Sequence, residues 1–232
     1  MHKCYMDNSC DTDISVDRFI YSSEIALLGS ASSLVVNNTV FDNIYGDVGI
    51  NILSNGKISL YNNSIKNCYF NNGFIKIDEK NSLFGNYIMD NIYFNNIRSN
   101  CGSVIHVDSL QKTTKTTVNI TNSVFESNVA EKYGGVIYSI SPYANKIFSL
   151  VNCTFYNNNA LLGKIVYSYD LKSEPNITNI EVLKSIKGNF ATNPTKLILN
   201  NELDEEISIY SGEMLPEGIS GNINIYNLTT TQ

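Results

Sequence analysis

His106 and a scattered set of aspartates are the side chains with which this chain could carry out acid–base chemistry. A polysaccharide lyase or hydrolase needs clustered carboxylates, with Arg, Lys or His on the same face, as acid, base or Ca²⁺ ligand. His106 lies on an expected strand, and alternation leaves open whether it faces inward or outward. The aspartates occupy different positions of the repeat described below and form no stack: Asp42, Asp47, Asp90 and Asp108. We therefore assign no catalytic residue.

Metal-binding patterns are incomplete as well. The spacing of Asp11, Asp13 and Asp17 could contact Ca²⁺, but the glycine and the terminal Glu of a calcium loop are missing, which favours a solvated acidic loop. The cysteines are odd in number and irregularly spaced, which fits neither a disulfide framework nor a C-x-x-C metal site. They are Cys4 and Cys10, which could close a small N-terminal loop, and Cys68, Cys101 and Cys153, expected as buried thiols. The sequence thus predicts no metal ion and no cofactor.

Composition narrows the possible partners. The 16 basic side chains are outnumbered by 22 acidic ones, the net charge is −6, and no basic run is present, so nucleic acid is a poor partner. No apolar run is long enough to span a bilayer. The N-terminal residues 1–11 lack the apolar core of a secretory signal, so the chain is either intracellular or cut from a longer one, and we favour the second.

A degenerate repeat organises the chain. Its template is apolar-x-apolar-x-Asn-x-x-apolar, and successive copies lie 24 to 31 residues apart. Period-2 alternation indicates a strand with one buried face, and the Asn that ends it indicates a turn. The anchors are Asn38/Phe41, Asn62/Ile65, Asn91/Phe94, Asn122/Phe125, Asn152/Phe155 and a weaker copy, Asn179/Val182. Two residues before the first five asparagines lie Val36, Leu60, Met89, Ile120 and Leu150.

Each copy continues with a glycine, a second strand and a polar corner of variable length, which leaves no room for a helix. The sequence therefore predicts an all-β fold, a right-handed parallel β-helix of about six to eight coils. We place the repeats at 33–190, a degenerate N-terminal coil or cap at 1–32, and a β-rich C-terminal cap or the start of a following domain at 191–232. A leucine-rich repeat is disfavoured because its Asn has different offsets from the flanking apolar residues.

The template asparagines and apolar residues are expected to form buried ladders, each asparagine amide bonding to the next coil. The predicted structural ladder comprises Asn38, Asn62, Asn91, Asn122 and Asn152 together with Phe41, Ile65, Phe94, Phe125 and Phe155. Several asparagines also lie in N-x-S/T sequons. We expect Asn62 and Asn152 to be inaccessible to a glycan, and the possible glycosylation sites are Asn37, Asn119, Asn176 and Asn227.

One repeat resembles a known family. The segments 125–128 (Phe-Glu-Ser-Asn) and 134–138 (Gly-Gly-Val-Ile-Tyr) resemble the F-x-x-N and G-G-aliphatic-aliphatic-Tyr repeat of polymorphic outer-membrane proteins and related β-helical microbial surface proteins. Other copies depart from this pattern. After Phe94, Ile97 stands where the F-x-x-N pattern has its Asn, and most second strands are preceded by one glycine where the pattern has two. The resemblance covers about residues 30 to 190 and implies a modular surface protein used in adhesion or recognition.

These observations favour a non-catalytic, extracellular or cell-surface module that recognises glycans or other surface proteins. The corner loops, 78–82 and 108–117 especially, are expected to present the recognition surface. Tyrosines such as Tyr61, Tyr93 and Tyr156 could stack on sugars, although they do not share one template column. The alternatives are a degenerate or atypical polysaccharide lyase or hydrolase and a structural spacer of a receptor ectodomain.

Overall fold

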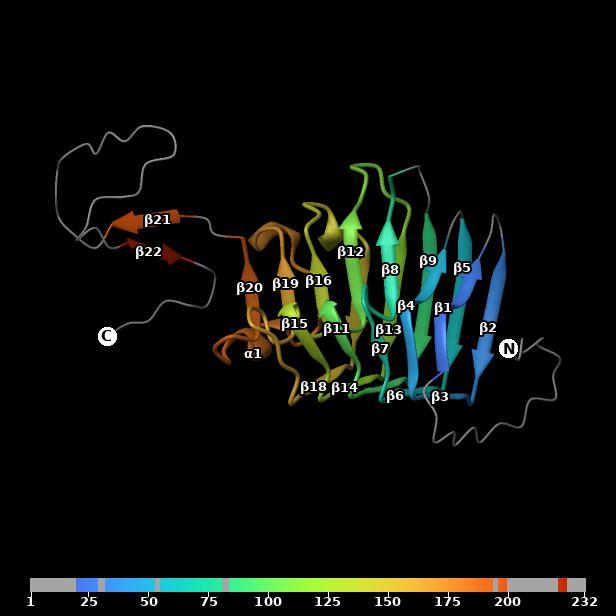
Figure 1. The fold of residues 1–232 in the computed structure, drawn as a ribbon. Helices are drawn as coiled ribbons and strands as arrows, with labels where there is room; N and C mark the ends of the chain where they lie inside the picture. Colours follow the sequence, from blue (N-terminus) through green and yellow to red (C-terminus); the bar gives the residue numbers. More distant parts are fainter. Residues whose placement is uncertain are drawn as a thin grey trace.

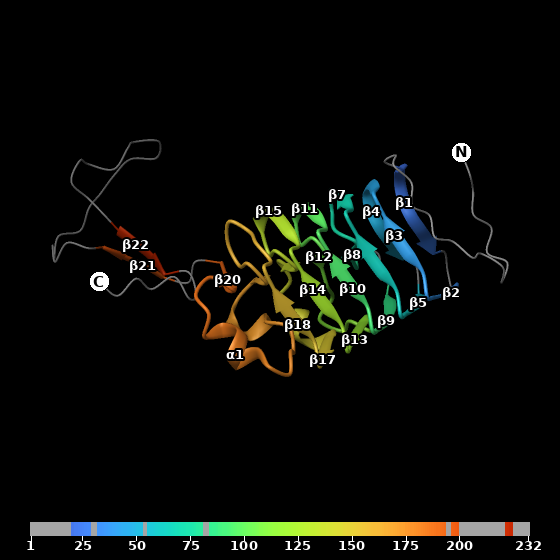
Figure 2. The same cartoon turned by 90° about the horizontal axis from the view of Figure 1, so that it is seen from below.

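The chain winds as a parallel β-solenoid in which successive coils add strands to the same three sheets (Figure 1). The computed structural model describes residues 20–28, 32–52, 55–80, 84–193, 196–199 and 221–224. The sheets are called A, B and C below. Seen from below in Figure 2, the strands of sheet C follow one another along the same axis. This confirms the all-β solenoid that the repeat predicts.

Sheets B and C are five-stranded and fully parallel. Sheet B consists of β2 (Ser33–Asn37), β5 (Gly56–Tyr61), β9 (Gly85–Asp90), β13 (Thr117–Thr121) and β17 (Phe148–Val151). Sheet C consists of β3 (Val40–Asp42), β6 (Ser64–Lys66), β10 (Tyr93–Asn95), β14 (Val124–Glu126) and β18 (Thr154–Tyr156). Each of the first five template copies therefore forms one strand of sheet B, an asparagine turn and one short strand of sheet C.

Sheet A has two rows of strands that meet on the long strand β4 (Ile44–Ile52). The first row contains β7 (Tyr69–Phe70), β11 (Arg98–Cys101) and β15 (Val129–Tyr133). The second row contains β8 (Ile75–Asp78), β12 (Ile105–Ser109), β16 (Ile137–Ser139), β19 (Val166–Ser168) and β20 (Phe190–Thr192). β4 also pairs with β1 (Ile20–Leu28), which lies within the expected degenerate N-terminal coil.

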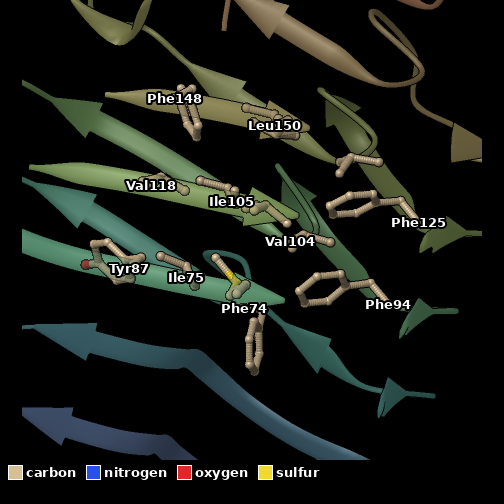
Figure 3. Packing of buried hydrophobic residues seen from close by; sticks show 14 of the residues in the cluster. Phe74, Ile75, Tyr87, Phe94, Val104, Ile105, Val118, Phe125, Phe148 and Leu150 are labelled. Carbon is tan, nitrogen blue, oxygen red and sulfur yellow. The ribbon is translucent and has the colours of Figure 1, made fainter. Parts of the chain in front are cut away.

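The template columns lie directly over one another in the core. Val36 pairs with Leu60, Leu60 with Met89, Met89 with Ile120, and Ile120 with Leu150 across sheet B. On sheet C, Phe125 is fully buried and stacks on Phe94 at 5.0 Å and on Phe155 at 4.7 Å between ring centroids. Figure 3 shows this stacking for Phe94 and Phe125, and for the sheet B column of Tyr87, Val118 and Phe148. No coil buries its apolar face alone, so neighbouring coils stabilise each other.

The template asparagines are not buried, which corrects the expected position of the ladder. Their side chains are exposed at the corner between sheets B and C, and they all adopt positive φ, between 50° and 55°. Asn is one of the few residues that adopts this left-handed conformation readily. Adjacent coils are still linked, since Asn91 Nδ2 donates to Asn62 Oδ1 at 2.8 Å and Asn152 Nδ2 to Asn122 Oδ1 at 2.7 Å. The asparagine thus ends the strand mainly through its backbone.

The buried amides lie one residue further along the chain. Asn63 follows the first corner, while Asn128 and Asn158 follow a second left-handed corner between sheet C and sheet A. Asn128 Oδ1 accepts from Ile97 N and its Nδ2 donates to Phe94 O, both at 3.0 Å. The side chain thus satisfies the hydrogen bonds of two buried backbone groups of the preceding coil. The turn reverses the direction of the side chain, and the next residue therefore points inward. The predicted bonds between template asparagines are thus present but exposed, and the buried amides Asn63, Asn128 and Asn158 form a separate set.

The solenoid is shorter than the predicted six to eight coils, since about four turns connect β2 to β17. The sixth template copy is wrong as a coil anchor, because Asn179 precedes the helix α1 (Ile180–Lys184). Only Ile177, bridged to Leu150, and β20 continue the sheets there. Two 3₁₀ turns occupy the variable corners, η1 (Ala144–Lys146) and η2 (Leu171–Ser173). Beyond them, β21 (Lys196–Leu199) and β22 (Gly221–Asn224) form an antiparallel pair.

Candidate functional site on the outer face of sheet A

A column of polar and aromatic side chains runs along the outer face of sheet A. In register across β8, β12, β16, β19 and β20, the column residues are Lys76, His106, Tyr138, Tyr167 and Ala191. They face outward because the residues that precede them on each strand, such as Ile105 and Ile137, are fully buried in the core. We call Lys76, His106, Asp108, Tyr133, Tyr138 and Tyr167 the outer cluster.

Glycines at the turn between the two rows of sheet A bring this column close to the backbone. Gly73, Gly102, Gly134 and Gly163 all adopt positive φ. A Cβ at Gly102 would lie 2.9 Å from the Cβ of Tyr138, and one at Gly73 would lie 3.3 Å from the Cβ of His106. The outer column therefore packs against the glycine turns, where a larger residue would be strained and crowded.

His106 is held from both sides of its ring. Its Nδ1 lies 3.0 Å from the carbonyl oxygen of Cys101, and its Nε2 lies 2.9 Å from Oδ1 of Asp108. A backbone carbonyl and an ionised carboxylate only accept hydrogen bonds, so both contacts are hydrogen bonds only when each ring nitrogen carries a proton. Lys76 Nζ lies 3.4 Å from the second oxygen of Asp108. His106 and Lys76 thus contact the same carboxylate.

Asp108 is ionised at neutral pH, and its contacts with His106 and Lys76 favour the charged carboxylate. The hydrogen bond from His106 lowers the pKa of Asp108 to about 2, with further attraction from the charges of His106 and Lys76 and against the opposing effect of partial burial. The contacts among His106, Asp108 and Lys76 therefore join two successive coils on the outer face of sheet A.

The tyrosines of the outer cluster pack beside His106. The Tyr138 ring lies 4.8 Å from the His106 ring and 5.7 Å from the Tyr167 ring, while Tyr133 lies 4.9 Å from Tyr167. Burial raises the pKa of Tyr138 to about 12, so its hydroxyl keeps its proton and remains a donor. Two exposed side chains flank this surface, Ile140 at 42 % and Tyr169 at 43 %. The result is an aromatic surface with polar tips.

A cavity of about 310 Å³ lies at the end of the column beyond Tyr167. At this end the column residue is the small Ala191, and the glycine of the turn is Gly163; both line the cavity. Its lining contains two exposed lysines and no carboxylate, and the remaining residues are apolar or glycine. The full lining is Ala160, Leu161, Leu162, Gly163, Lys164, Lys187, Gly188, Phe190 and Ala191.

The other aspartates considered for chemistry are not brought together. Asp42 pairs with Lys66 on sheet C, Asp47 accepts from Asn72 on the first row of sheet A, and Asp90 accepts from Asn122 at the corner of sheet B. Only Asp108 joins His106, because residues two apart on a strand face the same side. The His-x-Asp spacing was visible in the sequence and would have predicted this pair.

Two of the tyrosines considered for sugar stacking meet on sheet C. Tyr93 and Tyr156 both donate to the same oxygen of Glu126, Tyr156 at 3.0 Å. The hydrogen bond to this carboxylate raises the pKa of Tyr93 to about 12. Tyr61 lies at the end of β5 on sheet B, away from this group. Because both hydroxyls are engaged with Glu126, this group links three successive coils.

The variable corner is tied together by a buried carboxylate. Glu79 is 1 % exposed, and it accepts from the backbone N of Gln111 at 2.8 Å and from the hydroxyls of Thr114 and Thr116. In the described part of these corner loops, which excludes 81–83, the carboxylate thus anchors the longer loop to the preceding coil. The loop keeps exposed side chains at Lys112, Thr113 and Lys115.

The sequons lie away from sheet A. Asn37 and Asn119 are exposed on sheet B strands, and Asn176 is exposed beside the sheet B bridge at Ile177. Asn62 and Asn152, expected to be inaccessible, are exposed at the corner between sheets B and C. Asn227 lies outside the described residues, as do Asp11, Asp13, Asp17, Cys4 and Cys10.

The cysteines and carboxylates form no metal-binding group among the described residues. Cys68 and Cys153 are buried free thiols and Cys101 is partly exposed, and burial raises the pKa of all three. In the same part of the chain, no helix has the length and apolar character needed to cross a membrane.

Comparison with known proteins adds no relative. No protein-family model, no curated protein and no solved structure matches this chain. The similarity to polymorphic outer-membrane proteins therefore rests on the repeat residues alone, and the functional argument rests on the outer face of sheet A.

Proposed function

We propose that this chain is a non-catalytic recognition module of a microbial surface protein, and that it binds glycans through the outer cluster. The observation that carries this proposal is the row His106–Tyr138–Tyr167 on the outer face of sheet A. Tyr138 is partly exposed in this row, while His106 and Tyr167 pack on either side of it and are 8 % and 7 % exposed. Aromatic side chains with a polar tip suit ligands that are apolar on one face and hydroxylated at the edges, as sugars are.

Two features support this reading. Ile140 and Tyr169 add exposed apolar side chains beside the outer cluster. Exposed apolar surface of this kind is typical of interaction sites. The exposed sequons lie on sheet B and at its corner with sheet C, so glycans attached there would leave the outer face of sheet A uncovered. The repeat pattern similar to that of surface proteins agrees with this role.

A glycan array combined with a polysaccharide-turnover assay tests the proposal. We expect the chain to bind a subset of glycans without releasing reducing ends or unsaturated products. Tyr138→Ala should weaken binding about tenfold, equivalent to about 1.4 kcal/mol. The matched control is Tyr156→Ala, an exposed tyrosine on sheet C, which should bind as the unaltered chain does. Product formation would support the enzyme alternative, and no signal in either assay would support a structural spacer.

A further inference from the structure

The cavity beyond Tyr167 differs in charge from the rest of this acidic chain. The net charge is −6, yet the cavity is lined by Lys164 and Lys187 and by no carboxylate. Neither lysine forms an ion pair with any other described residue, and both are exposed. Two lysines without partners beside a cavity provide a local attraction for an anion.

The shape and the remaining lining favour a small ligand with an apolar face. A volume of about 310 Å³ is at the lower end of the range for small-ligand pockets, and it exceeds the space that a simple inorganic anion requires. Leu161, which is 75 % exposed, and the partly exposed Leu162 supply apolar surface in the same lining. Such a site suits a ring with C–H groups on one face and an anionic substituent.

The cavity continues the outer cluster along the solenoid axis. Tyr167 pairs in register with Ala191, and Gly163 follows Gly134 in the row of glycine turns. Successive strands are about 4.8 Å apart, so a ligand that follows the column from His106 through Tyr138 and Tyr167 would place its next unit at the cavity. The column and the cavity therefore form one continuous surface.

We propose that this cavity binds an acidic sugar, a monosaccharide unit bearing a carboxylate, within a glycan that lies along the outer cluster. The inference rests on the proposed glycan-binding function and adds the chemical class of the ligand. Lys164 and Lys187 attract the carboxylate, and the apolar surface of Leu161 and Leu162 contacts the sugar ring.

Isothermal titration with paired oligosaccharides tests the inference. The probes are an oligosaccharide of uronic acid units, its reduced neutral counterpart, a sulfated oligosaccharide and an acidic peptide of equal charge. We expect the uronic acid probe to bind at least about tenfold more tightly than the neutral one, with affinity falling as salt increases. The double variant Lys164→Met/Lys187→Met should lose this preference, and the double variant with Arg at both positions should retain it.

Matched controls separate the outcomes. Lys57→Met/Lys112→Met removes two exposed lysines elsewhere and should keep the preference. Equal binding of acidic and neutral probes would overturn the acidic-sugar assignment and leave the proposed glycan binding intact. Equal binding of the acidic peptide would show that the site recognises charge alone and would overturn it as well. Tighter binding of the sulfated probe than of the uronic acid would exclude the carboxylate. No binding of any glycan, here or on the array, would overturn the proposed function itself.

Discussion

The exposed asparagine Asn122 and the buried asparagine Asn128 should respond differently to replacement by glycine. Asn122 has φ of 50° and is exposed, whereas Asn128 is fully buried and has no positive φ. If the corner asparagine is selected for its backbone conformation, glycine should replace it well, because glycine adopts positive φ without strain. If the amide is what matters, glycine and alanine should be equally damaging.

The structure gives the expected magnitudes. Asn122→Ala forces a Cβ-bearing residue into the left-handed region, which costs about 1–2 kcal/mol. It also removes the exposed hydrogen bonds to Asp90 and from Asn152, worth roughly 0.5 kcal/mol each. Asn122→Gly loses only the hydrogen bonds and should cost about 1 kcal/mol. Asn128→Ala leaves Ile97 N and Phe94 O buried without partners, which should cost about 3 kcal/mol, and Asn128→Gly should be no better.

Urea unfolding followed by tyrosine fluorescence and far-ultraviolet circular dichroism measures these differences, since the chain has 15 Tyr and no Trp. The decisive quantity is the free energy of unfolding of the glycine variant minus that of the alanine variant at each position. We expect glycine to be the more stable at Asn122 by about 1 kcal/mol and to give no gain at Asn128. Equal losses at Asn122, or a similar gain at both positions, would refute the assignment of these two roles.

Two further predictions concern the core and the outer cluster. Phe125→Ala should lower the free energy of unfolding by about 3–5 kcal/mol, because the fully buried ring stacks on rings of both adjacent coils. Phe155 is partly exposed, so Phe155→Ala should lower it clearly less. Similar losses for the two variants in urea unfolding would contradict the ladder. The lowered pKa of Asp108, about 2 against an ordinary 3.8, should contribute roughly 1 kcal/mol after solvent screening, present above pH 4 and lost as the pH falls towards 2. An Asp108→Asn variant with the same loss of stability over that pH range would exclude this source.

The spacing of the repeat predicted the solenoid because its columns carry the same kind of residue in every coil. Val36, Leu60 and Met89 recur at one template position, and the structure pairs them in direct register. The sequence was less informative about which side chains point inward at the corners between the sheets. A positive φ turns the asparagine outward and the following residue inward, so the buried amide at Asn63 was missed.

The ends of the solenoid depended on contacts that the template does not describe. Asn179 matches the repeat pattern, but the segment that follows it forms α1, with only Leu183 buried within it. A short local pattern cannot distinguish a strand from a helical turn when one apolar residue decides the match. The predicted number of coils was therefore too large.

The sequence by itself determined the sheet strands, the buried apolar columns and the absence of room for a helix within the regular coils, because these depend on periodicity along the chain. Only the tertiary structure decided which side chains from different coils share the outer face of sheet A. Lys76, His106 and Tyr138 are about 30 residues apart and meet only because parallel strands stack in register. The cavity likewise required Gly163 and Ala191, from separate coils, to lie side by side.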